Sequence, residues 1–225
     1  MPRIVFVLGK GGVGRSTVAA ALGTLLAERG ERVLVMEWSI ADCIGPWFGA
    51  PPVGAQPVAI APRFSLCNFA LDEALRAYFV DHLHLGLVYR HVIRSPAVAQ
   101  VIAAAPGLSE MLFLGTLWWL ITLAEREVGL HFDRIVVDAP ATGHGASLLD
   151  VPATLSTMGV SKLLAVETRR LTELVADPDR VGAIVVGLPE PLVVDETLEL
   201  IPRVTQRLDR PPLALIVNRS TLAIA

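Results

Sequence analysis

The sequence predicts an α/β fold with a doubly wound, mostly parallel sheet and a helical insertion. Short apolar runs alternate with helical patterns along the chain, which is typical of parallel strands covered by helices. The first run, residues 4–8, leads through a glycine-rich turn into a helical pattern. No strand pattern is evident at about 65–130. The length of 225 residues suits one domain, 1–225, with the helical insertion at about 65–130.

The first part of the chain predicts two buried strands. The run IVFVL at 4–8 is continuously apolar, as buried parallel strands are, and ERVLVME at 31–37 predicts the second strand. Between them, residues 16–29 are rich in Ala and Leu, and Gly30 stands where a helix would end. Residues 45–62 are rich in Pro and Gly, which predicts a loop.

The rest of the chain continues the alternation. Residues 71–124 have a mostly helical pattern, broken at Ser95-Pro96 and at Pro106-Gly107. A third strand is predicted at 132–137 and ends at Asp138. The remaining predicted elements are one or two helices within 147–176, divided near Pro152 or Gly159, a strand at 181–186, a helix at 195–208 and a strand at 213–217.

Composition and charge limit the kinds of partner. The net charge of −3 gives no electrostatic reason to expect nucleic acid or an anionic membrane surface as a partner. The uncharged segment 111–124 is shorter than the roughly 20 residues of a spanning helix, so no transmembrane segment is expected. Because the chain enters its first strand almost at once, we expect no signal peptide and a cytoplasmic protein. The apolar fraction of 53% leaves room for an exposed hydrophobic interface.

The glycine-rich turn fits a phosphate-binding loop, which reads G-x-x-x-x-G-K-[ST] between a buried strand and a helix. Gly9 and Gly14 occupy the two glycine positions, Ser16 stands at the hydroxyl position, and Arg15 replaces the usual lysine. The residues predicted to bind nucleotide here are Gly9, Lys10, Gly11, Gly12, Val13, Gly14, Arg15, Ser16 and Thr17.

Physical chemistry explains why such a loop binds phosphate. Glycines let the backbone N–H groups turn inward and approach the oxygens closely, and the helix N-terminus adds partial positive charge. An ordinary glycine-rich turn between a strand and a helix is the alternative. Four glycines, two cations and a Ser-Thr pair at this spacing favour a site for ATP.

Asp138 lies where the predicted third strand ends, next to the phosphate loop. An aspartate at this edge of the sheet is placed to hold a water molecule bound to Mg²⁺, so Ser16 and Asp138 are the predicted metal-site residues. The alternative is a strand-ending aspartate that caps a turn. Gly143 and His144 follow in a segment suited to sensing the γ-phosphate.

These two motifs resemble the arsenite-pump/guided-entry (ArsA-like) ATPases, within the deviant-Walker class of dimerising P-loop NTPases that includes MinD. The class carries K-G-G-x-G-K-[ST], and Lys10 occupies its early lysine. DAPATGH at 138–144 is similar to the family's D-T-A-P-T-G-H, and Ala105–Leu108 resembles part of its helical subdomain. Leu188–Leu192 with Asp195–Thr197 resembles its P-E-x-L…E-T segment, and Asn218 resembles its adenine-reading asparagine.

The resemblance implies a P-loop NTPase fold, ATP and Mg²⁺ as cofactors, and a dimer. The partner would be a second copy or an ArsA-like paralogue, with a hydrophobic client protein as a further partner. Lys10 would be catalytic by acting across the dimer on the partner's nucleotide, and Glu190 and Asn218 would join the nucleotide site. A MinD-like positioning ATPase is a weaker alternative, because an amphipathic C-terminal helix is lacking. The family also continues well beyond Asn218, which implies a truncated or a reduced member.

Two departures from the family pattern weigh against efficient hydrolysis. Arg15 keeps the positive charge of the class lysine but is bulkier and planar. The first switch of the family resembles D-x-D-P-A-H; here Glu37 keeps the first acid, whereas Ser39 replaces the aspartate that orients water, and only a shifted loop would let Asp42 substitute. We therefore expect slow or partner-dependent hydrolysis, with a non-hydrolysing partner subunit as the alternative. The metalloid-binding cysteine triad and the zinc Cys-x-x-Cys are absent from the sequence, so neither arsenite transport nor a zinc-bridged dimer is expected.

Three further groups of residues have an ordinary structural explanation. His82, His84 and His91 lack the spacing of metal ligands on one helical turn and are expected to be exposed or capping. Cys43 and Cys67 are expected to be buried thiols. A hydrophobic cluster would either line a client groove or form the core of the helical insertion, which we favour; it consists of Met111, Leu112, Phe113, Trp118 and Trp119.

Overall fold

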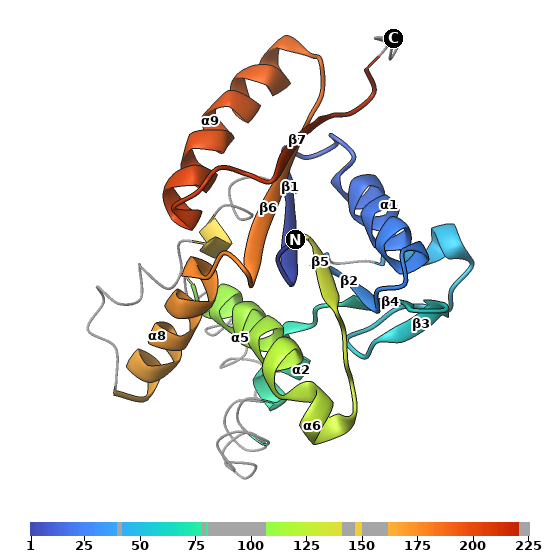
Figure 1. The fold of residues 1–225 in the computed structure, drawn as a ribbon, viewed down its shortest axis with the longest axis vertical. Helices are drawn as coiled ribbons and strands as arrows, with labels where there is room; N and C mark the ends of the chain where they lie inside the picture. The colour runs from blue at the N-terminus through green and yellow to red at the C-terminus, as the bar shows by residue number, and fades with distance from the viewer. Residues whose placement is uncertain (40–41, 78–79, 81–106, 141–146, 150–161, 221–225) are drawn as a thin grey trace.

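A seven-stranded sheet forms the centre of the protein in a computed structural model that describes residues 1–39, 42–77, 80, 107–140, 147–149 and 162–220 (Figure 1). The strand order is β3-β4-β2-β5-β1-β6-β7, and every neighbouring pair is parallel except β3 and β4. The strands are β1 (Ile4–Gly9), β2 (Val33–Glu37), β3 (Val58–Ala61), β4 (Phe64–Asn68), β5 (Arg134–Asp138), β6 (Val181–Gly187) and β7 (Ala214–Val217). The predicted α/β fold with a mostly parallel sheet is confirmed.

Helices cover both faces of this sheet, as the alternation of elements predicts. They are α1 (Arg15–Glu28), α2 (Leu71–Arg76), α5 (Leu108–Thr122), α6 (Ala124–Val128), α8 (Lys162–Ala176) and α9 (Pro191–Leu208), with short 3-10 helices η1 (Gly45–Phe48) and η4 (Ser147–Leu149). Along β1, Val5 and Val7 face the core on the α1 side, whereas Ile4 and Phe6 face α5, α8 and α9. Because β1 is central and buried on both faces, its sequence is a continuous apolar run.

The antiparallel pair β3–β4 corrects the prediction of a loop at 45–62 and of a strand-free stretch from 65 onward. β3 is only four residues long and half exposed, so its VAIA sequence is too short and too close to Pro and Gly to stand out. Arg63, in the left-handed region at φ 66°, makes the tight turn into β4. β4 pairs with β2, and it buries Phe64 and Leu66 in the core on the α1 side of the sheet and Cys67 in the core on the other side.

Helix α9 begins at Pro191, four residues before the predicted start at 195. Proline at the first helical position has a suitable φ and lacks only an N–H that would have no helical partner there. The predicted break at Pro106-Gly107 agrees with Gly107, which precedes α5 in the left-handed conformation. The breaks at Ser95-Pro96, Pro152 and Gly159 lie outside the described residues, as do His82, His84 and His91.

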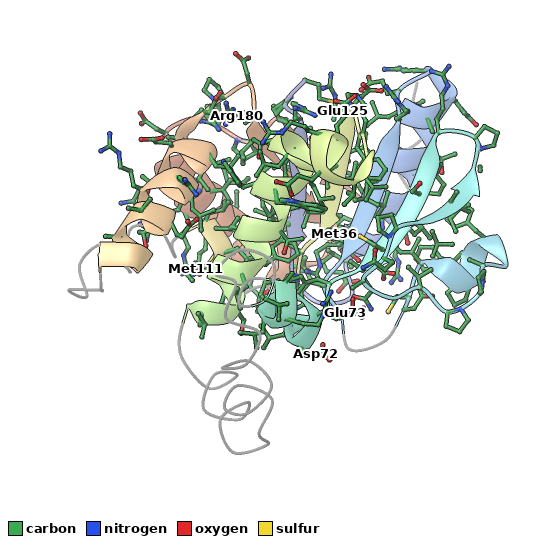
Figure 2. The ribbon with its side chains drawn as sticks, turned by 90° about the horizontal axis from the view of Figure 1, so that it is seen from below. Met36, Asp72, Glu73, Met111, Glu125 and Arg180 are labelled. Carbon is green, nitrogen blue, oxygen red and sulfur yellow. The ribbon has the colours of Figure 1, made fainter. Side chains whose placement is uncertain are left out.

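The aromatic and aliphatic residues of α5 belong to the core, as we favoured over a client groove. Met111, Leu112 and Phe113 are buried, while Trp118 and Trp119 are partly buried and pack against the same cluster. Met111 of α5 and Met36 of β2, both labelled in Figure 2, belong to this cluster. The described helices α2, α5 and α6 lie within the predicted insertion, whose status as a subdomain of one domain stays a prediction.

The two cysteines differ in exposure. Cys67 is buried as predicted. Cys43, on the loop between β2 and η1, is exposed, so the prediction of a buried thiol is wrong there. Burial raises the pKa of the Cys67 thiol above its usual range. Among the helices that the structure describes, none combines the length and the apolar character required to cross a membrane.

Candidate nucleotide-binding site

The glycine loop lies between the end of β1 and the start of α1, where the sequence places it (Figure 1). Gly12 and Gly14 adopt left-handed backbone conformations with φ of 84° and 92°, which favour glycine. A Cβ atom on Gly9 would collide with the carbonyl oxygen of Val186 in β6, and one on Gly14 would collide with the side-chain amide of Asn218. The glycines are therefore required by the shape of the loop.

Ser16 and Asp138, the predicted metal-site residues, are in direct contact. The Ser16 hydroxyl donates a hydrogen bond of 2.5 Å to Oδ2 of Asp138. The second oxygen, Oδ1, is buried without a hydrogen-bond partner among the described residues. A buried carboxylate oxygen with unused lone pairs, beside a hydroxyl, provides the oxygen donors that Mg²⁺ prefers. The residues present therefore fit a magnesium site, and Mg²⁺ bound there would neutralise phosphate charge.

Electrostatics at Asp138 reflect its burial. Desolvation raises the pKa of the Asp138 carboxyl, while the hydrogen bond from Ser16 and the positive charge of Arg15 oppose the rise. Arg15 is itself partly buried, and its Nη1 donates to the carbonyl oxygen of Ala139, next to Asp138. Burial lowers the pKa of Arg15, opposed by the charge of Asp138. A guanidinium has five N–H donors, so this single bond leaves donors for a phosphate.

Lys10 does not point freely into solvent. Its Nζ forms an ion pair of 2.6 Å with Oε1 of Glu196, on the second turn of α9. The two side chains are 31% and 40% exposed, so both remain within reach of solvent and ligands. The sequence placed Glu196 in a motif but did not indicate this contact with Lys10.

Asn218 and Glu190 lie at the ends of neighbouring elements on the same edge of the sheet. The Asn218 side-chain amide donates to the Val13 carbonyl at 2.9 Å, and its backbone N–H donates to Gly187 at 2.8 Å. Glu190 is exposed and immediately precedes α9. Asn218 thus contacts the phosphate loop itself. Its adenine-binding role and the place of Glu190 in the nucleotide site both stay predictions.

The segment predicted to be the first switch is built around Glu37, which is buried at the end of β2. Its carboxyl oxygens accept hydrogen bonds from the backbone N–H groups of Cys43 and Ile44, both at 3.2 Å. Burial is the main cause that raises the Glu37 pKa to about 7, and the neighbouring carboxyl of Asp42 adds to the rise. Asp42 in turn accepts bonds from the backbone of Gly45 and Val53. Both carboxyl groups thus hold the loop together.

Asn68 is a residue of this region that sequence reasoning missed. Its Oδ1 accepts the backbone N–H of Ser39 at 3.2 Å, and its Nδ2 donates to the Ser39 carbonyl at 3.1 Å. Asn68 ends β4, and a polar residue at a strand end would have been a signal had that strand been predicted. Ala141, Thr142, Gly143 and His144, the rest of the second predicted switch, lie outside the described residues.

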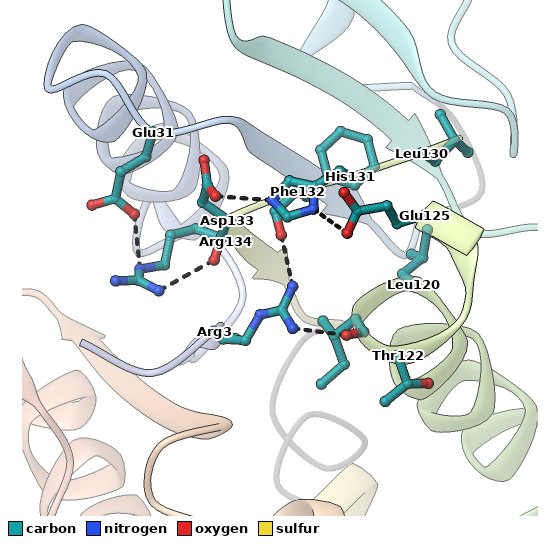
Figure 3. A pocket seen from close by; sticks show the side chains of 11 residues that line it. Arg3, Glu31, Leu120, Thr122, Glu125, Leu130, His131, Phe132, Asp133 and Arg134 are labelled. Atoms are coloured by element: carbon teal, nitrogen blue, oxygen red, sulfur yellow. Dashed lines mark hydrogen bonds and ion pairs between the residues drawn. The ribbon is translucent and has the colours of Figure 1, made fainter. Parts of the chain in front are cut away.

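Figure 3 shows the side chains that line a cavity of about 460 Å³. They include Arg3, which precedes β1, and Arg134, which begins β5. The cavity therefore lies at the amino ends of these strands, whereas the glycine loop follows the carboxyl end of β1. Its charged groups are largely paired with one another, as Arg134–Glu31 at 2.9 Å, His131–Glu125 at 2.7 Å and His131–Asp133 at 3.0 Å. These pairings indicate a structural role.

Comparison with known proteins agrees with this geometry. The family of anion-transporting ATPases, ArsA_ATPase, matches residues 2–168. The "ATPase BagA" of Mycobacterium tuberculosis is 34% identical over 97% of this chain and 65% of its own length. The "Arsenical pump-driving ATPase" of Acidiphilium multivorum is 30% identical over 69% of this chain and 26% of its own, and "ATPase ASNA1 homolog 1" of Paramecium tetraurelia is 28% identical over 71% and 46%.

The chain spans 65% of the length of its BagA-type relatives, so what such whole proteins do is not carried over with the fold. The family match, however, covers well over half of the chain and includes β1, the glycine loop and Asp138. The match therefore contains both the glycine loop and the segment that begins at Asp138, and the hydrogen bond from Ser16 to Asp138 brings these two motifs into contact. This protein therefore belongs to the ArsA family of anion-transporting ATPases.

Proposed function

We propose that this chain binds ATP with Mg²⁺, forms a dimer, and couples its nucleotide state to a conformational change for a client or partner protein. The observation that carries the proposal is the contact of Ser16 with Asp138 at the start of α1, together with Asp138 Oδ1, which has no hydrogen-bond partner in the described part of the chain. Gly11, Gly12, Gly14 and Arg15 would hold the phosphates. Ser16 and Asp138 would hold Mg²⁺.

The same proposal gives Lys10 a role across the dimer, where it would neutralise charge on the partner's nucleotide. Glu190 and Asn218 would contribute to the nucleotide site. The partner would be a second copy or a paralogue. The net charge of −3 is consistent with proteins rather than nucleic acid as partners, and the cytoplasm is the proposed location.

Slow hydrolysis is supported by the arrangement of the first switch. Ser39 offers no carboxylate, and the carboxyl groups of Glu37 and Asp42 are used by loop N–H groups. Among the described residues of this switch, neither acid is thus available to orient water. A partner or a rearrangement of the loop would have to supply that function. The second candidate, a non-hydrolysing partner subunit, is favoured by the same observation, that the carboxyl groups of Glu37 and Asp42 are used by loop N–H groups.

Exposed apolar side chains on α9 and β7 support a protein partner. Leu192 and Leu198 of α9 are 66% and 61% exposed, and Leu215 and Val217 of the edge strand β7 are each about half exposed. Large apolar side chains exposed to solvent are typical of interaction surfaces. These residues are candidates for contact with the hydrophobic client or with another part of the assembly.

ATP binding and turnover by the purified chain test the proposal. Mg²⁺-dependent turnover by the unmodified chain that Lys10→Ala abolishes supports an active ATPase and contradicts the non-hydrolysing subunit. Binding without turnover, with turnover gained by the combined Arg15→Lys and Ser39→Asp variant, favours that subunit instead. If calorimetry detects no ATP binding by the unmodified chain, the proposal is wrong.

A further inference from the structure

The ion pair between Lys10 and Glu196 joins the phosphate loop to α9. The Nζ–Oε1 distance of 2.6 Å allows a charge-assisted hydrogen bond, and the residues are separated by 186 positions in the sequence. Because the proposed role of Lys10 requires its ammonium group at a nucleotide, this in-chain partner bears directly on function.

Glu196 is held in place because the start of α9 packs closely on the end of β6. Val193 and Thr197 are buried, and the Thr197 hydroxyl donates to the Val193 carbonyl at 2.6 Å. A Cβ atom on Gly187 would lie only 2.9 Å from the Thr197 hydroxyl oxygen, so the helix sits almost on the backbone of β6. Because its neighbour Thr197 packs against β6, the backbone of Glu196 is held close to the sheet.

The elements β6, α9 and β7 contact the phosphate loop at a second point. Gly187 accepts the backbone N–H of Asn218, whose side chain donates to the Val13 carbonyl. Lys10 and Val13 flank the central glycines of the loop, and both are thus tied to the β6–α9–β7 unit. A change in the loop on binding phosphate would be transmitted to α9 through these contacts.

We infer that Glu196 is the counterion that holds Lys10 within its own chain, and that it competes with nucleotide phosphates for the ammonium group. The competition rests on the proposed function; the counterion role does not. A pair of partly exposed charges is weak enough to be exchanged for a phosphate. An ammonium is also a point charge without the planar fork by which arginine holds carboxylates. Of the 19 Lys and Arg residues, only Lys10 and Lys162 are lysine, so this position departs from the chain's general use of arginine.

Chemical acylation of the nucleotide-free chain tests the counterion role. With only two lysines, the modification of Lys10 relative to Lys162 can be read from peptide masses. We expect Glu196→Gln to raise this ratio about two- to fivefold, the range that exposed ion pairs give. Glu199→Gln is the matched control, because Glu199 lies on the same helix and pairs with Arg203. An equal ratio in the wild-type and Glu196→Gln chains would overturn the counterion role.

The dissociation constant of the dimer with ATP and Mg²⁺, measured by sedimentation, tests the competition. Glu196→Gln should lower it about two- to fivefold, while Glu199→Gln leaves it unchanged. An unchanged or weaker dimer in Glu196→Gln overturns the competition. If none of these chains, the wild type included, binds ATP, the proposed function fails together with the competition, and the acylation ratio still decides the role of Glu196. Matching thermal unfolding of the two variants verifies that both are folded.

Discussion

Strands β2 and β5 run in parallel and place Glu37 and Asp138 opposite one another at the same edge of the sheet. Both carboxyl groups are buried, at 1% and 7% exposure, and burial raises the pKa of both. Both oxygens of Glu37 accept backbone N–H groups, whereas Asp138 uses one oxygen for Ser16 and leaves Oδ1 without a described partner.

The difference shows that a position at the carboxyl end of a central strand does not by itself give an acidic side chain a chemical role. Unused lone pairs on a buried carboxylate are costly unless a ligand takes them, so Asp138 is suited to a cation. Neither carboxyl oxygen of Glu37 is left in this way, because one accepts the backbone N–H of Cys43 and the other that of Ile44. We therefore expect Glu37 to act on stability and Asp138 to act on metal and nucleotide binding.

The largest expected effect is the pH dependence of stability that arises from Glu37. Its pKa rises from 4.5 to about 7 on folding, so the folded chain binds this proton more tightly than the unfolded chain. The resulting stability is fully present below pH 4.5 and is lost as the pH rises through about 7. Over that window it amounts to about 3 kcal/mol, since one pKa unit corresponds to about 1.4 kcal/mol. Denaturant unfolding at a series of pH values measures it.

Glu37→Gln is the variant that isolates this contribution. The amide does not titrate, so most of the fall in stability between pH 5 and 7 should disappear. Any slope that remains should have the same sign, because burial also raises the pKa of Asp138. A variant whose slope equals that of the wild type would show that Glu37 does not titrate in this window.

The second expected effect concerns the metal. Asp138→Asn replaces the carboxylate that would hold the water shell of Mg²⁺, and such partners typically change metal affinity or activity by about 10- to 100-fold. We expect a loss of this size in the Mg²⁺-dependent part of ATP binding, measured by calorimetry with and without Mg²⁺. Glu37→Gln serves as the control and should retain the Mg²⁺ dependence. Equal losses in both variants would remove the distinction between the two acids.

How far the sequence predicts this region depends on the signal that each residue leaves. Asp138 was predictable because it ends a strand of strong apolar character, and Ser16 because the loop motif fixes its position. Arg15 and Ser39 were visible as departures from a pattern. The family comparison supports the fold and the ATPase family.

The remainder depends on contacts between distant segments. The pair of Lys10 with Glu196 joins residues 186 positions apart, and no local pattern indicates which carboxylate a lysine meets. Strand β4 was missed because Ser65 interrupts its apolar residues and it follows a stretch rich in Pro and Gly, although it pairs with β2 inside the sheet. With β4 missed, Asn68 had no position relative to Ser39.

Asn68 provides the smallest and most local prediction about the Glu37 side of the comparison. Its two hydrogen bonds hold both backbone groups of Ser39, directly after the strand that ends in Glu37. Asn68→Ala should lower the free energy of unfolding by about 1–3 kcal/mol, because each of the two hydrogen bonds contributes about 0.5–1.5 kcal/mol. Ser65→Ala on the same strand is the control, and denaturant unfolding measures both. If the first switch contributes only to stability, Asn68→Ala leaves Mg²⁺-dependent ATP binding unchanged; a loss there as large as that of Asp138→Asn would place the Ser39 backbone in the nucleotide site.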